Sequence, residues 1–337
     1  MHKVIIDSDW GGDVLQLTSI LAARSDQYEI LGATVTFGNA SLAQNVLNAG
    51  AMLKLMHLDE QVPYFAGAVA PSGQNSPPEG DCAHGKTGLG NAVVQHSTVP
   101  PANQHAVDFI LEQVEKAPEK AITLIATAPL TNIANAIRQA PVLMAKLKEI
   151  RIMGGCVQPL NGYRVDAQNN RLSENIIERY GNITEHAEFN FQQAPHDAAT
   201  VMGSSIPLAL FPMDCTHQMT LTPSRQAKLK SVFATRPDLC KQLLDLMTGP
   251  SHIDERKFGI DSTLHDAHTT LSMVSPRLYT GTRGVISVSV APDEPYHGRS
   301  TLIKKANGPH WIAGKITNPE EAYDHLLDAM RHVLVKI

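Results

Sequence analysis

The sequence predicts an α/β protein in which one mostly parallel central sheet is flanked by helices. Its 337 residues are 43% apolar and 18% charged, the ordinary composition of a globular chain with a buried core. Short β-branched runs alternate with longer segments of helical periodicity, which is typical of βαβ units. No linker-like stretch divides the chain. We therefore expect residues 1–337 to form a single, Rossmann-like domain.

The expected elements follow one another in a regular order. Apolar runs predict strands at residues 4–6, 30–36 and 122–126, followed by helices at 15–23, 42–56 and 132–137 respectively. Apolar runs at residues 150–153 and 208–213 extend the pattern into the second half. Near the end, Asn318-Pro319-Glu320-Glu321 is a helix-start signature, and apolar residues at helical spacing follow as far as Leu334.

Three segments interrupt this pattern, at residues 71–86, 158–182 and 248–262. Each is rich in Gly, Pro, Asn or charged residues. Loops of this length are uncommon in a compact domain and often cover an active site. We expect all three to be surface loops or lids.

Charge and cysteine content exclude several classes of protein. The net charge of −5 lacks the basic excess that nucleic-acid binding uses, so we expect no nucleic-acid partner. No run of about 18 apolar residues suggests a membrane span, and no export signal is visible, so we expect a cytoplasmic protein. The four cysteines form no C-x-x-C pair, and we expect free thiols.

Polar residues follow the ends of the predicted strands. Asp7 and Asp9 follow the first, Asn39 the second and Thr127 the third. In an open parallel sheet these ends share one edge, where ligands bind. Asp13 brings a third carboxylate close to the first two, and such crowding favours a bound Ca²⁺ or Mg²⁺ ion.

Two other interpretations of this first motif remain open. Aspartates also serve as local helix caps and turn residues. The pattern of Asp7 and Asp9 after a first strand is also similar to the D-x-D signature of haloacid dehalogenase-like phosphatases, in which an aspartate is the nucleophile. The downstream pattern of those phosphatases is not evident here.

Taken together, widely spaced segments resemble the nucleoside hydrolase family, the inosine-uridine preferring nucleoside N-ribohydrolases. The resemblance covers nearly the whole chain, and the segments occur in the family's order. They are Asp7-Ser8-Asp9 with Gly11, Thr34-Val35-Thr36-Phe37-Gly38-Asn39, His84-Gly85-Lys86-Thr87-Gly88-Leu89-Gly90, Ala128-Pro129-Leu130-Thr131-Asn132, Met153-Gly154-Gly155, Ala187-Glu188-Phe189-Asn190, Asp214-Cys215-Thr216-His217-Gln218 and His265-Asp266.

The resemblance implies hydrolysis of the N-glycosidic bond of a ribonucleoside with the help of Ca²⁺. It implies that Asp9, the carbonyl of Thr127 and Asp266 hold the ion, and that Asp9 also activates the attacking water. The other roles it implies are ribose binding by Asn39, Glu188 and Asn190, proton donation to the leaving base by His265, and a place near the base for His84. It also implies a homodimer or homotetramer.

The first motif departs from the family pattern D-T-D-P-G-x-D-D. Trp10 replaces the proline, and Asp13 stands alone where two aspartates are expected. Aligned without a gap, Asp13 is a ribose ligand and Val14 replaces a calcium ligand; with a one-residue deletion, which we favour, Asp13 is the calcium ligand. Either way one carboxylate is missing, so calcium binding is weakened or lost.

This departure leaves two functions open, a divergent hydrolase, which we favour, and a ribosyl-ligand binding protein that has lost its activity. Two aromatic residues near the motifs are also of interest. Trp10 is expected either to stack on the base or to pack in the interior. Phe189 is expected in the core.

Overall fold

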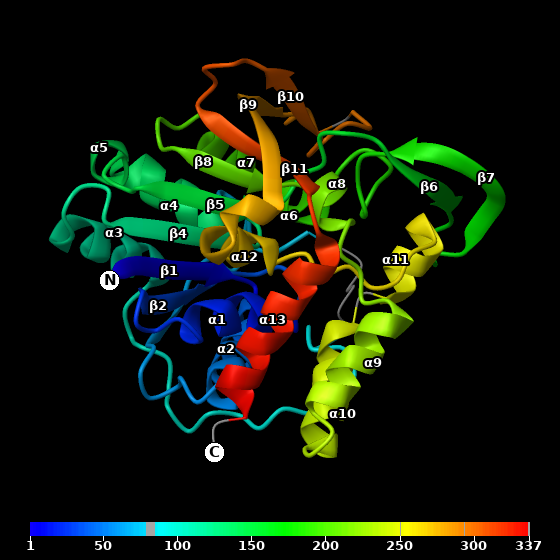
Figure 1. The fold of residues 1–337 in the computed structure, drawn as a ribbon. Helices are drawn as coiled ribbons and strands as arrows, with labels where there is room; N and C mark the ends of the chain where they lie inside the picture. The colour runs from blue at the N-terminus through cyan, green and yellow to red at the C-terminus, as the bar shows by residue number, and fades with distance from the viewer. Residues whose placement is uncertain (79–84, 250, 293, 336–337) are drawn as a thin grey trace.

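The computed structural model describes residues 1–78, 85–249, 251–292 and 294–335. Its main feature is a nine-stranded sheet with the strand order β10-β9-β11-β8-β5-β4-β1-β2-β3 (Figure 1). The strands are β1 (His2–Ser8), β2 (Tyr28–Val35), β3 (Tyr64–Ala66), β4 (Ile122–Thr127), β5 (Glu149–Met153), β8 (Leu208–Phe211), β9 (Tyr279–Val288), β10 (Ser300–Lys304) and β11 (His310–Ile316). All neighbouring pairs from β11 to β3 are parallel, and β9 is antiparallel to both of its neighbours. The predicted fold class is confirmed.

Helices cover both faces of this sheet, and a core lies between the sheet and the helices on each face. The side chains of β1 alternate between these two cores. Val4 and Ile6 of β1 belong to one core and Ile5 to the other. Residues of α1 (Val14–Ala22), α2 (Leu42–Leu55), α9 (Pro223–Val232), α10 (Pro237–Met247), α12 (His268–Val274) and α13 (Pro319–Leu334) pack in the first core. Residues of α3 (Ala106–Lys116), α4 (Thr131–Gln139), α5 (Pro141–Met144) and α7 (Pro195–Met202) pack in the second.

The last helix begins where its sequence predicts. The side chain of Asn318 caps α13 by accepting a hydrogen bond from the backbone N–H of Glu321 at 3.2 Å. Pro319 occupies the first turn, where its missing N–H has no helical partner to lose. The apolar side of α13 then packs against α1.

Two segments expected to be loops contain regular structure instead. Residues 158–182 include the antiparallel hairpin of β6 (Leu160–Val165) and β7 (Arg171–Arg179), and residues 248–262 include helix α11 (Ser251–Phe258). The hairpin lies outside the main sheet and is mostly exposed, so its strands lack the apolar runs that mark buried strands. Within 71–86, the described residues form no helix or strand.

The hairpin and α11 are joined by side chains that bind backbone carbonyls. The Arg171 guanidinium donates to the carbonyl oxygens of Glu255 and Arg256 at 2.5 and 2.9 Å. The Lys257 ammonium donates to the carbonyl of Asn182, just beyond β7, at 2.6 Å. We call these two elements together the outer lobe; Figure 1 shows them side by side at one edge of the molecule.

Two remaining expectations concern cysteines and membrane spans. Cys156, Cys215 and Cys240 are buried free thiols, as predicted, while Cys82 lies outside the described residues. Across the described ranges, none of the helices combines the length and apolarity that crossing a bilayer requires.

Candidate functional site

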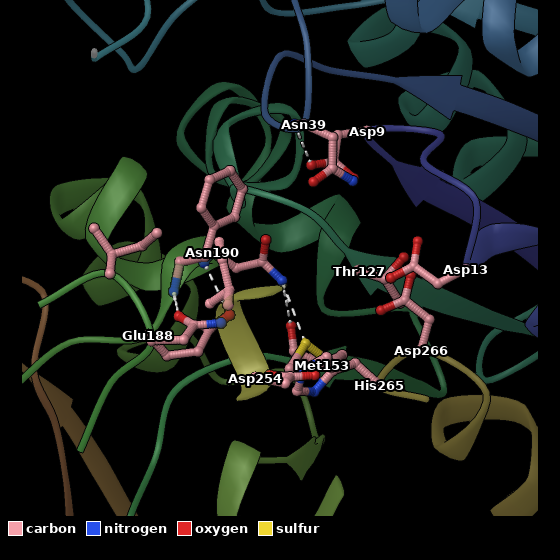
Figure 2. A pocket seen from close by; sticks show the side chains of 14 residues that line it. Asp9, Asp13, Asn39, Thr127, Met153, Glu188, Asn190, Asp254, His265 and Asp266 are labelled. Atoms are coloured by element: carbon pink, nitrogen blue, oxygen red, sulfur yellow. Dashed lines mark hydrogen bonds between the residues drawn. The ribbon is translucent and has the colours of Figure 1, made fainter. Parts of the chain in front are cut away.

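A pocket lies at the carboxyl ends of the parallel strands, where the alternation of strands and helices places a ligand site. It is lined by Asp9, Asp13, Asn39, Thr127, Met153, Asn182, Ile183, Glu188, Phe189, Asn190, Ile253, Asp254, His265 and Asp266 (Figure 2). Asp9 follows β1, Thr127 ends β4 and Met153 ends β5. The pocket therefore brings together the predicted site residues of the first strands and those of residues 188–190 and 265–266.

Asp9 is held in a fixed orientation by Asn39. The backbone N–H and the side-chain amide of Asn39 donate to the two carboxylate oxygens of Asp9 at 2.7 and 3.0 Å. Gly38 makes this approach possible, since a Cβ there would lie 2.2 Å from Asp9 Oδ2. Burial, and then the charge of Asp13, raise the pKa of Asp9 well above its ordinary value.

Asp13, Thr127 and Asp266 meet at the side of the pocket next to Asp9 (Figure 2). Burial and the charges of Asp13 and Asp9 raise the pKa of Asp266, while its hydrogen bond with Thr127 opposes that rise. Three carboxylates in one buried space repel one another unless a cation or protons compensate their charge. Because all the donors are oxygens, this group fits a hard divalent cation such as Ca²⁺.

Asp13, not Val14, is directed to the pocket. Asp13 is the N-cap residue of α1, whereas Val14, the first residue of that helix, is fully buried in the core. The structure thus directs the carboxylate of Asp13 to the pocket and keeps Val14 in the core.

Glu188 and Asn190 form a second wall. The carboxylate of Glu188 caps the short helix α6 (Phe189–Gln193) by accepting from the N–H groups of Asn190 and Phe191, and it also accepts from Gly155 N–H at 2.7 Å. Burial nevertheless raises the pKa of Glu188 to about 7. The amide nitrogen of Asn190 donates to the carbonyl of Met153 at 3.0 Å, which directs its amide oxygen to other partners.

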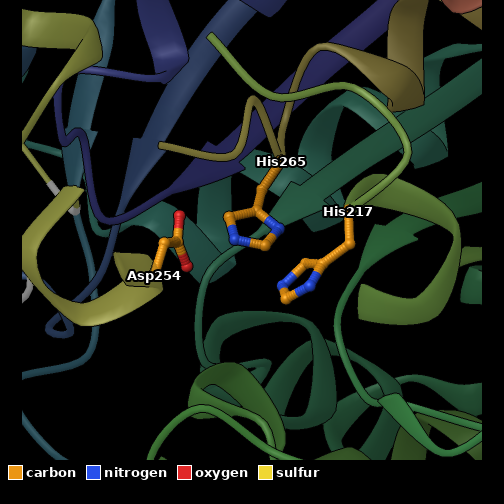
Figure 3. Close-up of side chains that lie close together, drawn as sticks. All are labelled: His217, Asp254 and His265. Carbon is orange, nitrogen blue, oxygen red and sulfur yellow. The ribbon is translucent and has the colours of Figure 1, made fainter. Parts of the chain in front are cut away.

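His265 lies between Asp254 and His217 (Figure 3). One ligand atom from each of these three residues lies within 4.8 Å of the others. The Thr216 hydroxyl lies 2.7 Å from His265 Nδ1 and 3.3 Å from the carbonyl oxygen of Met213. Residues 262 and 264 hydrogen-bond to residues 221 and 219 as a short antiparallel pairing, and this pairing places His265 beside Thr216.

Trp10 requires a correction, because it does not line the pocket. Its φ of 44° turns the chain sharply after β1, and its indole N–H donates to the carbonyl of Thr34 in β2 at 3.2 Å. The side chain is 0% exposed and packs in the core, so the prediction that it contacts a base is wrong. Asp7 is also fully buried, with Oδ1 accepting from Thr34 and Asn132, which leaves no access for a role as phosphatase nucleophile.

Other pocket residues were not predicted, or were assigned to the core. Phe189 is half-buried in the pocket wall, so its assignment to the core is wrong. Ile183, Ile253 and Asp254 belong to no recognisable motif. Ile253 and Asp254 fall within the expected lid at residues 248–262, and Ile183 directly follows the one at residues 158–182. His84 lies outside the described residues.

Helix α8 (Met213–Thr216) supplies the hydroxyl that holds His265, although it lines no part of the pocket itself. The segment Asp214-Cys215-Thr216-His217-Gln218 marked this region in the sequence, and Thr216 is the residue through which it acts on the site.

Known proteins are similar to this chain over most of its length. The family model described as inosine-uridine preferring nucleoside hydrolase matches residues 4–323. An uncharacterised protein of Schizosaccharomyces pombe is 31% identical over 280 residues, which are 83% of this chain and 82% of that protein. The pyrimidine-specific ribonucleoside hydrolase RihB of Escherichia coli O1:K1 is 28% identical over 276 residues, 82% of this chain and 79% of that enzyme.

Among solved structures, the purine-preferring ribonucleoside hydrolase from Gardnerella vaginalis has a TM-score of 0.82 at 24% identity, covering 99% of this chain and 100% of that one. This likeness concerns the fold, and the family model concerns the sequence from the first strand to the last helix. The chain belongs to the inosine-uridine preferring nucleoside hydrolase family.

Proposed function

We propose that the protein hydrolyses the N-glycosidic bond of a ribonucleoside to free base and ribose. The observation that carries this proposal is the meeting of Asp9 and Asp13 with Asp266, from opposite ends of the chain, in a pocket whose other walls carry Glu188 and Asn190. Carboxylates and amides are suited to holding the hydroxyls of a sugar.

The residues at the sheet edge fit Ca²⁺. We infer that Asp9, Asp13, Thr127 and Asp266 hold the ion, with Asp13 as a metal ligand, because the donors are oxygens and the pKa values of Asp9 and Asp266 are raised in the absence of a compensating charge. When bound, the ion supplies positive charge that keeps the carboxylates ionised and makes a nearby water more acidic. With Val14 in the core, one fewer carboxylate is present, and affinity is correspondingly weak.

Asp9 accepts the proton of the attacking water in this mechanism. Its carboxylate is pinned by two donors from Asn39, so the oxygen that faces the water has a defined direction. Glu188, Asn190 and Asn39 orient the ribose so that C1′ faces the attacking water. C1′ becomes electron-poor as its bond to the base breaks. His265, which also lines the pocket, assists departure of the base.

A second candidate function is binding of a ribosyl compound without turnover. The observation that favours it is Val14, because loss of a charged ligand weakens the cation on which water activation depends. This protein would keep the pocket and lose the chemistry.

A panel of purine and pyrimidine ribonucleosides tests the proposal, since similar proteins include a pyrimidine-specific and a purine-preferring enzyme. Release of free base and reducing sugar is followed with added Ca²⁺ and after chelation, for the wild-type protein and for Asp9→Ala. We expect release that requires Ca²⁺ and is abolished by Asp9→Ala. Nucleoside binding without release would instead establish the binding protein.

A further inference from the structure

Asp254 is a pocket residue to which neither the sequence motifs nor the proposed mechanism gives a role. Helix α11 carries it into the pocket wall beside His265, and its side chain is 2% exposed (Figures 2 and 3). Its Oδ2 accepts a hydrogen bond from the backbone N–H of Thr263 at 2.7 Å. This bond, together with a side-chain interaction with Thr263, orients the carboxyl group.

The position of Asp254 is fixed by the outer lobe. Arg171 binds the carbonyls of the two residues that follow Asp254, and Lys257 binds the carbonyl of Asn182. The helix that carries Asp254 is therefore held against the hairpin at its carboxyl-terminal end. A buried carboxyl group with this much support is placed for a defined contact.

The hydrogen bonds of His265 determine what it offers to Asp254. The Thr216 hydroxyl lies 2.7 Å from His265 Nδ1 and 3.3 Å from the carbonyl oxygen of Met213. In the tautomer of His265 that carries its proton on Nδ1, the hydroxyl accepts from Nδ1–H and donates to Met213. In the neutral ring, Nε2 then carries a lone pair. Figure 3 shows a ring nitrogen of His265 on the side of Asp254, and ligand atoms of the two residues lie within 4.8 Å of each other. With this tautomer of His265, Asp254 is the member of the pair that can bring a proton to the pocket.

We propose that Asp254 is the acid that protonates the base as it leaves, an inference that rests on the proposed hydrolase function. As the C1′–N bond breaks, its electron pair passes to the base, and the carboxyl O–H of Asp254 gives its proton to an accepting nitrogen or oxygen of the base. The oxygen of water bonds to C1′, and its proton passes to Asp9. Solvent then reprotonates Asp254 and takes the proton from Asp9, which completes the cycle. His265 becomes a positioning residue that accepts from Asp254.

The charge environment of Asp254 agrees with this role. Burial raises the pKa of its carboxyl to about 7, and the attraction of Lys257 opposes the shift only in part. The neighbouring His217 is held neutral, since burial lowers its pKa to about 3. A carboxylic acid that keeps its proton near neutral pH is a suitable general acid.

Two substrates with different leaving groups test the proposal. Ribonucleosides hydrolysed by the wild-type protein need a proton on the base, whereas 4-nitrophenyl β-D-ribofuranoside releases a stable anion that needs none. For Asp254→Asn we expect kcat to fall about 10²- to 10³-fold with nucleosides, and less than about threefold with the nitrophenyl riboside. Asp254→Glu, which keeps the acid, should retain more nucleoside hydrolysis than Asp254→Asn.

Glu255→Gln is the matched control, because Glu255 is the exposed neighbour of Asp254 on α11. It should leave both activities unchanged, and thermal melting should show that all variants fold. Equal losses on the two substrates would overturn the inference, and so would full nucleoside activity in Asp254→Asn. Equal losses are what we would expect if His217, Asp254 and His265 instead hold a metal ion, because Asp254→Asn would then remove one of its ligands. If the wild-type protein releases neither base nor nitrophenolate, the hydrolase proposal itself fails, and this inference fails with it.

Discussion

The pocket has two ends that are built in different ways. We call Asp9, Asp13, Asn39 and Thr127 the sheet-edge group, and Ile183, Phe189, Ile253 and Asp254 the outer group. Members of the sheet-edge group follow or end buried parallel strands, or stand at the N-cap position of the helix after the first of them. The outer group lies on α6, on α11 and on the chain between β7 and α6.

This difference separates two chemical tasks. Every ribonucleoside presents the same ribose, and the sheet edge offers it a rigid set of carboxylates and amides. Leaving bases differ in shape and in where they accept a proton, and the outer group consists of apolar side chains and one acid. On the proposed function, ribose binding and water activation belong to the sheet-edge group, and selectivity for the base and its protonation belong to the outer group.

The largest expected effect contrasts two aspartates of the first motif. Asp9→Asn removes the base that takes the proton from water, and kcat should fall about 10³-fold with nucleosides and with the nitrophenyl riboside alike. Asp7→Asn should change kcat less than about threefold, because its remaining oxygen can still accept from Thr34 and Asn132. Steady-state kinetics of both variants check this. Full activity in Asp9→Asn would mean that the sheet-edge group does not activate the attacking water.

The two ends also differ in how far the sequence predicts them. Apolar β-branched runs predicted β1, β2 and β4, and since parallel strands end at one edge, Asp9, Asn39 and Thr127 followed from spacing alone. Asp266 does not follow a strand, and only the family resemblance indicated it.

The outer group could not be predicted in the same way. Its position depends on contacts between residues far apart in the chain, such as Arg171 with Glu255 and the pairing of residues 219–221 with 262–264. The sequence does not decide between the two places expected for Trp10, for a related reason. A single backbone angle, φ of 44°, decides whether its ring faces a ligand or the core, and residue type does not reveal that angle.

A second prediction concerns the role of Asp13 within the sheet-edge group. If Asp13 is a metal ligand, Asp13→Asn should weaken Ca²⁺ binding about 100-fold, because a hard cation loses a charged oxygen. The rise in melting temperature on titration with Ca²⁺ measures this without reference to activity. The exposed Asp26→Asn serves as control. Unchanged Ca²⁺ binding with a raised KM for nucleosides would make Asp13 a ribose ligand instead.

A third prediction uses pH to examine the outer group. A buried carboxyl with a raised pKa binds its proton more tightly in the folded state, so its contribution to stability is present at low pH and is lost as the pH rises through about 7. Between pH 5 and pH 8, the wild-type protein should lose about 2 kcal/mol of unfolding free energy that Asp254→Asn does not lose.

Urea unfolding of both proteins at the two pH values measures this difference, with Glu255→Gln as control. The groups that face Asp254 are Lys257, His265 and His217, and all three remain in the variant. Identical pH dependence in the wild-type protein and Asp254→Asn would mean that Asp254 is ionised throughout this range, and would count against its role as an acid.

The smallest expected effect separates the two aromatic residues. Trp10→Phe removes the indole N–H bond to Thr34 and part of the buried ring, so the unfolding free energy should fall about 1–2 kcal/mol while KM for nucleosides stays the same. Phe189→Leu should do the reverse, raising KM about fivefold with little change in stability, because the ring is half-buried in the pocket wall. Chemical unfolding and steady-state kinetics on both variants check the pair. A raised KM in Trp10→Phe would mean that the buried ring of Trp10 determines the shape of the sheet-edge group. The assignment of separate tasks to the two ends of the pocket would then be incomplete.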